Sequence, residues 1–330
     1  MCAAGTYSGR VELSSNIKSI LRPCVMICPD TLYIYKMLLL SQGFVEAQTL
    51  ASKLNSLISI AERDDFGPPN LWGIQTIKCI LQMATSLAAS GPEENEIILL
   101  GTAVREFILP RIEPRFAVWI ENIVVDIFGT EKVDTQASLQ NDAWTPALHH
   151  AYEHLGMQPN DIQSVSAIQM HNLMDFRQSN IILGGSGTGK TTIWRLLADV
   201  HERIQGQLVT ICVNPKTLSV QEFCGHLDVD GEWNDGLFTK VIRGIAKTLS
   251  TYHWVVFDST ISTDWIETVQ PLFSNRMGCV LPNGERMSIT SKTQLIFEAS
   301  ELLHATPCVL ADCGLINIPG SNLWKHIGSR

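Results

Sequence analysis

Residues 184–192 place glycines, a lysine and several hydroxyl side chains in the spacing G-x-x-x-x-G-K-T, a set suited to holding phosphate. The glycines let the backbone curl so that its N–H groups face a phosphate chain, and the N-terminus of a following helix adds positive potential. Lys190 is then expected at the β- and γ-phosphates, and the Thr191 hydroxyl on Mg²⁺. We therefore predict that ATP or ADP binds with Mg²⁺ at a loop made of Gly184, Gly185, Ser186, Gly187, Thr188, Gly189, Lys190, Thr191 and Thr192.

The residues on either side of this loop supply the structural context that the chemistry needs. Residues 181–183 are apolar and predict a strand that enters the loop, and residues 193–197 continue from it at helical spacing. A strand, a glycine-rich loop and a helix in this order distinguish a phosphate-binding loop from a chance glycine turn.

A second candidate for the same site is Asp258, at the end of the apolar run 252–258. An acid in this position is expected to hold Mg²⁺, so Thr191 and Asp258 are the predicted metal ligands. Hydrolytic versions commonly carry a Glu directly afterwards, but this chain has Ser259. A hydroxyl is not basic near pH 7, and a missing general base costs roughly 10²–10⁴ in rate. The sequence predicts ATP binding with little or no hydrolysis and no catalytic residue; an active ATPase with its base at Glu298 or Glu301 is the alternative.

Composition narrows the class of protein. The chain has 330 residues, of which 45% are hydrophobic and 17% charged, which is typical of a globular protein of two domains. The net charge of −9 argues against a nucleic-acid partner, and the absence of a long uncharged apolar run argues against a membrane segment. The nine cysteines contain no C-x-x-C pair and predict free thiols. The string from His150 to His154 has the order H-x-x-E-H, but without a third acidic ligand we interpret it as surface.

The pattern along the chain predicts an all-helical part followed by an α/β part. A short buried strand is expected at 23–29, helical periodicity covers 30–128, 134–142 is a polar linker, and helices at 147–155 and 162–176 lead to the loop. From residue 180 the predicted strands are 181–183, 208–213, 254–257, 293–297 and 315–318, and the predicted helices are 190–205, 237–249 and 264–273. Such alternation predicts a mostly parallel sheet with helices on both faces. A helical bundle placed before a phosphate-loop domain also suggests the end of one module joined to the start of the next.

Several strings resemble the motor ring of dynein heavy chains, which carries six AAA+ modules in one polypeptide. Residues 10–13, 16–18, 21–23 and 29–30 are similar to the end of the first module's large domain, and 43–44 and 92–96 to its helical small domain. The match to the second module is denser: it includes Pro215-Lys216, Gly225, Asp228, the string EWNDGL at 232–237, Trp265, Glu267 and the string LPNGER at 281–286.

The resemblance implies a division of the chain and further site residues. Residues 1–29 would be the last strand region of a first AAA+ large domain, 30–135 its helical small domain, 136–165 a linker, and 166–330 the P-loop AAA+ large domain of the second module. Arg22 and Arg105 would serve the neighbouring module's site, with Arg105 at a surface left open by the missing first P-loop. Where the family commonly has an arginine before Cys-Gly, this chain has Asp312, which repels phosphate charge. The second module of dyneins usually lacks the catalytic Glu, which fits Ser259.

The resemblance also implies partners and a location. The partners would be the other AAA+ modules of the same heavy chain and, through the full-length ATP-driven motor, dynein intermediate, light intermediate and light chains and microtubules. The location would be the cytoplasm and cytoskeleton, or the axoneme of a cilium or flagellum. A stand-alone P-loop regulator that binds nucleotide without turnover is the alternative from another class of protein.

Overall fold

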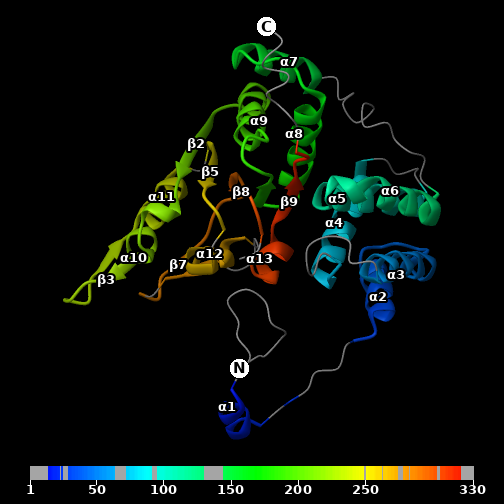
Figure 1. The fold of residues 1–330 in the computed structure, drawn as a ribbon, viewed down its shortest axis with the longest axis horizontal. Coiled ribbons are helices and arrows are strands. Elements are labelled where there is room, and N and C mark those ends of the chain that lie inside the picture. Colours follow the sequence, from blue (N-terminus) through cyan, green and yellow to red (C-terminus); the bar gives the residue numbers. More distant parts are fainter. Residues whose placement is uncertain are drawn as a thin grey trace.

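The computed structural model describes residues 14–22, 24, 29–63, 72–90, 95–129, 144–248, 250–261, 263–273, 278–281, 283–302 and 305–320. Figure 1 shows a helical part, coloured blue to cyan, beside an α/β part coloured green to red. This arrangement confirms the predicted fold class, an α/β P-loop domain preceded by an all-helical domain. Within the described ranges, none of the helices combines the length and apolarity that crossing a bilayer requires.

The helical part is built from amphipathic helices with clear start and stop signals. Asp30 and Asn95 cap two of them by accepting a backbone N–H, Pro114 opens another, and Gly129, in the left-handed region, ends it. The predicted helical stretch breaks at 42–46, where the Glu96 carboxylate accepts two backbone N–H groups. The helices are α2 (Thr31–Ser41), α3 (Ala47–Arg63), α4 (Ile74–Ser90), α5 (Glu96–Ile108), η1 (Leu109–Arg111) and α6 (Pro114–Phe128).

The N-terminal segment stands apart from this bundle. A short helix, α1 (Ser15–Ile20), lies away from the rest of the chain in Figure 1, and none of its six described residues is buried. The predicted strand at 23–29 falls mainly on residues outside the described ranges.

The α/β part is organised around a parallel sheet in the order β2-β5-β8-β1-β9. Its strands are β1 (Ser179–Leu183), β2 (Leu208–Val213), β5 (Tyr252–Asp258), β8 (Thr293–Ala299) and β9 (Gly314–Asn317). Each contains a predicted strand or overlaps one, and β2 has the predicted bounds. Because all strands run the same way, their carboxyl ends meet at one edge, where β1 leads into the phosphate loop.

The two faces of the sheet carry separate layers. Side chains that alternate along β5, such as Val256 on one face and Phe257 on the other, belong to two different cores. The first face packs against α8 (Asp161–Met174) and α9 (Lys190–Gln205), and its core is continuous with that of the helical bundle. The second face is covered by α10 (Val220–Cys224), α11 (Leu237–Lys247) and α12 (Thr263–Val269), followed by η3 (Gln270–Leu272).

The structure describes residues 144–165 of the segment predicted as a linker, 136–165. Its described part forms α7 (Trp144–His154) and the start of α8. Leu148 and Tyr152 of α7 pack on Leu196 and Val200 of α9 in a small core of their own. These helices bury apolar surface on the α/β part. Residues 130–143 lie outside the described ranges.

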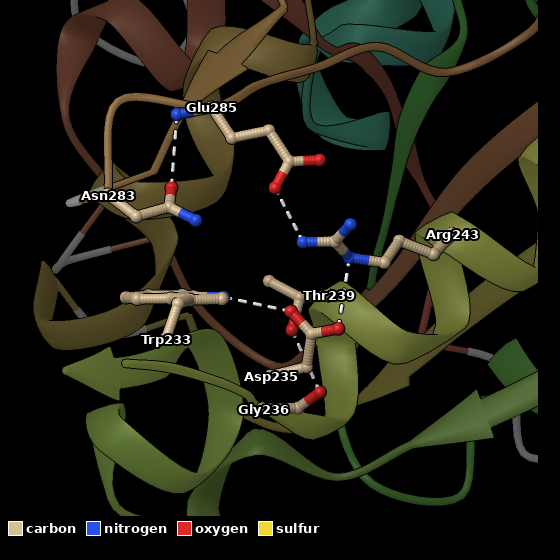
Figure 2. A network of polar contacts seen from close by, with 7 residues as sticks. All are labelled: Trp233, Asp235, Gly236, Thr239, Arg243, Asn283 and Glu285. Carbon is tan, nitrogen blue, oxygen red and sulfur yellow. Dashed lines mark hydrogen bonds and ion pairs between the residues drawn. The ribbon is translucent and has the colours of Figure 1, made fainter. Parts of the chain in front are cut away.

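Two small hairpins extend from the second face of the sheet, and the sequence did not predict them. β3 (Gly225–Leu227) pairs with β4 (Trp233–Asp235), and β6 (Cys279–Val280) pairs with β7 (Arg286–Met287). Figure 2 shows Arg243 of α11 between them, paired with Asp235 at 3.0 Å and with Glu285 at 2.6 Å. The two strings that carried the family resemblance therefore meet in one polar network.

The bundle docks on the α/β part near the beginning of β9. The Arg111 guanidinium, 2% exposed, donates to the Cys313 carbonyl at 2.6 Å, and Arg177 donates to the Ala311 carbonyl and to the Cys79 sulfur. Burial, with Arg177 nearby, lowers the pKa of Arg111 to about 10, so it remains charged at neutral pH. The predicted docking of bundle and P-loop domain is confirmed, with α13 (Pro307–Asp312) and β9 as the docking edge.

Candidate nucleotide site

The loop after β1 has the backbone shape that its glycines predict. Gly187 and Gly189 have φ of +76° and +88°, a region that side chains with a Cβ rarely adopt. Gly184 is packed closely, since a Cβ there would lie 2.6 Å from the Thr188 hydroxyl, which donates to the Gly185 carbonyl. Glycine is therefore favoured at positions 187 and 189 by the backbone conformation and at position 184 by close packing.

Lys190 stands at the first residue of α9 and reaches back over the loop. Its ammonium donates to the carbonyls of Gly184 and Gly185, at 2.7 Å in each case. Ser186 is exposed, Thr192 is half-buried, and the capping position Gly189 has no side chain to cover the first N–H groups of the helix. A positive charge and helix N–H groups thus lie together at the carboxyl edge of the sheet, which is an arrangement suited to a phosphate chain.

Two acids come from neighbouring strands at the same edge. Asp258 ends β5 and is exposed, and its partner in the sheet register is Glu298 of β8. Paired residues of parallel strands project to the same face, here the face covered by α9. Glu298 is 7% exposed; it accepts from the Thr191 hydroxyl at 2.8 Å and from the Trp194 indole N–H at 2.6 Å. Sequence reasoning had considered this glutamate only as an alternative base.

The two carboxylates also affect Cys212 on β2, the strand next to β5 in the sheet. Desolvation, together with the Glu298 and Asp258 carboxylates, raises the pKa of the Cys212 thiol on β2. This thiol therefore stays protonated near pH 7 and supplies no nucleophile to the site.

Neither Ser259 nor Glu301 is arranged as a base. The Ser259 hydroxyl donates to the carbonyl of Thr260 at 3.2 Å, and Glu301 is exposed beyond the end of β8. With both oxygens of Glu298 engaged, the acids of this edge are better suited to holding a cation than to activating water.

The residues present fit a magnesium nucleotide. The Thr191 hydroxyl and the Asp258 carboxylate are oxygen donors, the kind that Mg²⁺ prefers. Lys190 and the first N–H groups of α9 would hold the phosphates, and the tight packing at Gly184 lets the backbone approach them. A bound Mg²⁺ would neutralise phosphate charge and fix the phosphate oxygens.

The arginines predicted for a neighbouring module's site belong to the N-terminal segment and to the helical bundle. Arg22 is exposed just after α1. Arg105 is 7% exposed, so the prediction that its side chain lies at an open surface is wrong. The reason is that α5 is surrounded by the other helices of the bundle, and six apolar side chains of the helix are also buried. Asp312, in the position of the family arginine, accepts from the Gln270 amide at 3.5 Å.

The histidines of the H-x-x-E-H string have acidic neighbours. His150 lies 3.4 Å from Glu153, and His154 lies 2.9 Å from Asp199 of α9. Among the described residues, no group of three or more His, Cys, Asp and Glu is placed to hold a metal ion.

The fold and the loop define a P-loop domain of the AAA type, and comparison with known proteins gives its family. The family model described as the hydrolytic ATP-binding site of the dynein motor region matches residues 2–191, and the AAA domain of the dynein-related subfamily matches 179–309. The chain therefore belongs to the dynein heavy chain family and contains part of its AAA region.

Individual relatives agree with this assignment. The chain is 30% identical to human dynein axonemal heavy chain 9 over 327 residues, which is 97% of this chain. It is 29% identical to the dynein-1-alpha heavy chain of the flagellar inner arm I1 complex of Chlamydomonas reinhardtii and 30% identical to cytoplasmic dynein 2 heavy chain 1 of the same organism, over 96% and 94% of the chain. The chain spans about 7% of the length of these relatives.

Proposed function

We propose that this chain is the ATP-binding junction of two modules in a dynein motor ring. It would bind ATP or ADP with Mg²⁺ at residues 184–192, with Asp258 as the second metal ligand, and would hydrolyse ATP slowly or not at all. The observation that carries the proposal is the pairing of a complete phosphate loop with Ser259 in the base position, where its hydroxyl donates to its own neighbour's carbonyl. The site would then have a structural or regulatory role.

The module assignment is supported by chain order and by the two family matches. One match ends at residue 191 and the other begins at 179, so they overlap over β1 and the phosphate loop. A helical domain that precedes a P-loop domain, and docks on it through Arg111 and β9, is expected for a small domain that serves the module upstream. We propose that residues up to 129 end the first module and that residues 144–320 belong to the second.

The activity of the whole protein is proposed on the same basis. The relatives include axonemal, flagellar and cytoplasmic dynein heavy chains, so the parent protein would be an ATP-driven microtubule motor located in the cytoskeleton or in a cilium. Its other AAA modules, dynein intermediate, light intermediate and light chains, and microtubules would be partners of the full-length chain.

Phosphate release by the purified chain tests the low-hydrolysis proposal. Turnover of the wild-type chain should stay near background, because among the described residues Ser259 is not basic and both carboxylate oxygens of Glu298 already accept hydrogen bonds. A turnover of about 1 s⁻¹ or faster, ordinary for enzymes, would show that another residue is the base. Ser259→Glu adds a carboxylate at the end of β5 and should raise turnover above that of the matched control Ser259→Ala; equal rates in the two variants would mean that a base alone does not restore hydrolysis.

A further inference from the structure

Glu298 is a buried acid that the proposed function does not yet use. It lies near the end of β8, paired in the register with Ile182 on one side and with Asp258 on the other. Its side chain projects to the face covered by α9, and only 7% of the residue is exposed. Burial of a carboxylate costs free energy unless its oxygens accept hydrogen bonds. The groups that donate to Glu298 therefore indicate its role.

Both oxygens of this carboxylate are held by residues of the first two turns of α9. The Thr191 hydroxyl donates to Oε2 at 2.8 Å, and the Trp194 indole N–H donates to Oε1 at 2.6 Å. An indole N–H can only donate, and Trp194 is itself buried at 6% exposure, so the contact fixes the orientation of the carboxylate. Glu298 cannot turn toward another group without leaving the indole N–H unpaired.

The Thr191 contact has a consequence for metal binding. A hydroxyl carries one hydrogen and two lone pairs. When the hydrogen points to Glu298, the lone pairs remain available to a cation, and the acceptor makes the oxygen a better ligand. The negative charges of Glu298 and Asp258 also favour the binding of a divalent cation at this edge.

We infer that Glu298 is a positioning residue that orients the Thr191 hydroxyl for Mg²⁺, with Trp194 holding the carboxylate in place. The inference rests on the proposed nucleotide site, and it assigns Glu298 a role other than that of a base. It predicts that Glu298 acts on the metal-dependent part of nucleotide binding and not on the contacts of the phosphates with the loop.

The test measures binding of a fluorescent ADP analogue by anisotropy, with Mg²⁺ and with EDTA. The quantity compared is the ratio of the Kd without the metal to the Kd with it. Glu298→Gln should lower this ratio about tenfold, the lower end of effects seen when an outer-sphere partner is removed. Its affinity in EDTA should not fall, because the loop contacts are intact and a negative charge is gone. Glu301→Gln, which removes an exposed carboxylate three residues away, is the matched control and should keep the wild-type ratio.

A double-mutant cycle tests whether Glu298 acts through Thr191. Thr191→Val should also lower the ratio, and adding Glu298→Gln to it should change the ratio no further. Trp194→Phe keeps the ring packing but removes the donor, and should lower the ratio several-fold; this variant decides the question if Glu298→Gln does not fold.

The outcomes separate the two claims. A wild-type chain that binds no nucleotide overturns the proposed function. A wild-type chain that binds, combined with an unchanged ratio in Glu298→Gln or Trp194→Phe, overturns only the inference. Equal losses with the metal and with EDTA, or additive effects in the cycle, would show a purely structural role and also overturn it.

Discussion

Replacing Lys190 by alanine is expected to weaken nucleotide binding about 30- to 150-fold. Two unit charges 4 Å apart interact by about 4 kcal/mol at the effective dielectric of a partly exposed site. When the ammonium binds phosphate, it loses its 2.7 Å hydrogen bonds to the carbonyls of Gly184 and Gly185. This loss offsets part of the interaction energy with the phosphate. A net loss of about 2–3 kcal/mol remains, which corresponds to that range of Kd.

Calorimetric titration with Mg-ADP measures the change directly. Lys247→Ala, which removes an exposed lysine at the end of α11, is the control for net charge and should bind as the wild-type chain does. Thermal melting without nucleotide checks that the Lys190 variant is folded. A folded Lys190→Ala chain with wild-type affinity would refute the assignment of the phosphate site.

Three further predictions concern stability. Arg111→Met should lower the free energy of unfolding by about 2 kcal/mol in urea titrations, because the Cys313 carbonyl loses a charged donor. Arg243→Met should cost at most about 1 kcal/mol, since its ion pairs are partly exposed, but should speed hydrogen exchange in both hairpins. Burial lowers the pKa of His201 to about 4 from 6.5, so the unfolded chain binds more protons between these values. Stability should therefore fall as pH drops from 6.5 to 4, by up to about 3 kcal/mol, and His201→Phe should remove this part of the slope.

Each of these predictions has a control and a contrary outcome. Arg115→Met, a control on the exposed side of the bundle, should change the free energy of unfolding by less than about 0.5 kcal/mol. If Arg111→Met has an equally small effect, the contact of Arg111 with the Cys313 carbonyl does not stabilise the docking. Unchanged exchange in 225–235 and 285–287 would show that Arg243 does not join the hairpins. An identical pH slope in wild-type and His201→Phe chains would mean that His201 titrates normally.

The main elements of the fold could be predicted because they carry strong local patterns. The helix 190–205 and the strand 208–213 have the predicted bounds, since one follows a glycine loop with a clear apolar face and the other is a compact β-branched run. The hairpins were missed because their strands have only two or three residues and form from turn chemistry and contacts with α11. Their strings were recognised as family features, but the ion pairs of Arg243 that join them depend on tertiary packing.

Only part of the candidate site could be predicted, because only part of it is a local sequence pattern. The phosphate loop is a contiguous motif, whereas the place of Glu298 depends on which strand lies beside β1. A signal was present: the runs ending at Asp258 and at Glu298 are both apolar strands that end in an acid, and parallel strands bring such ends together. Arg105 was misplaced because chain order gives no information on how deeply α5 is buried.

The identity of the nucleotide held by the wild-type chain shows whether this site binds ATP without hydrolysing it. The chain would be loaded with radiolabelled ATP and Mg²⁺, freed of excess nucleotide, incubated for an hour and then denatured, and the released nucleotide would be separated and counted. We expect about one nucleotide per chain, recovered mainly as ATP, with none retained by Lys190→Ala. Recovery of the label mainly as ADP and phosphate would contradict the absence of a working base at Ser259, and a wild-type chain that retains no label would contradict the site itself.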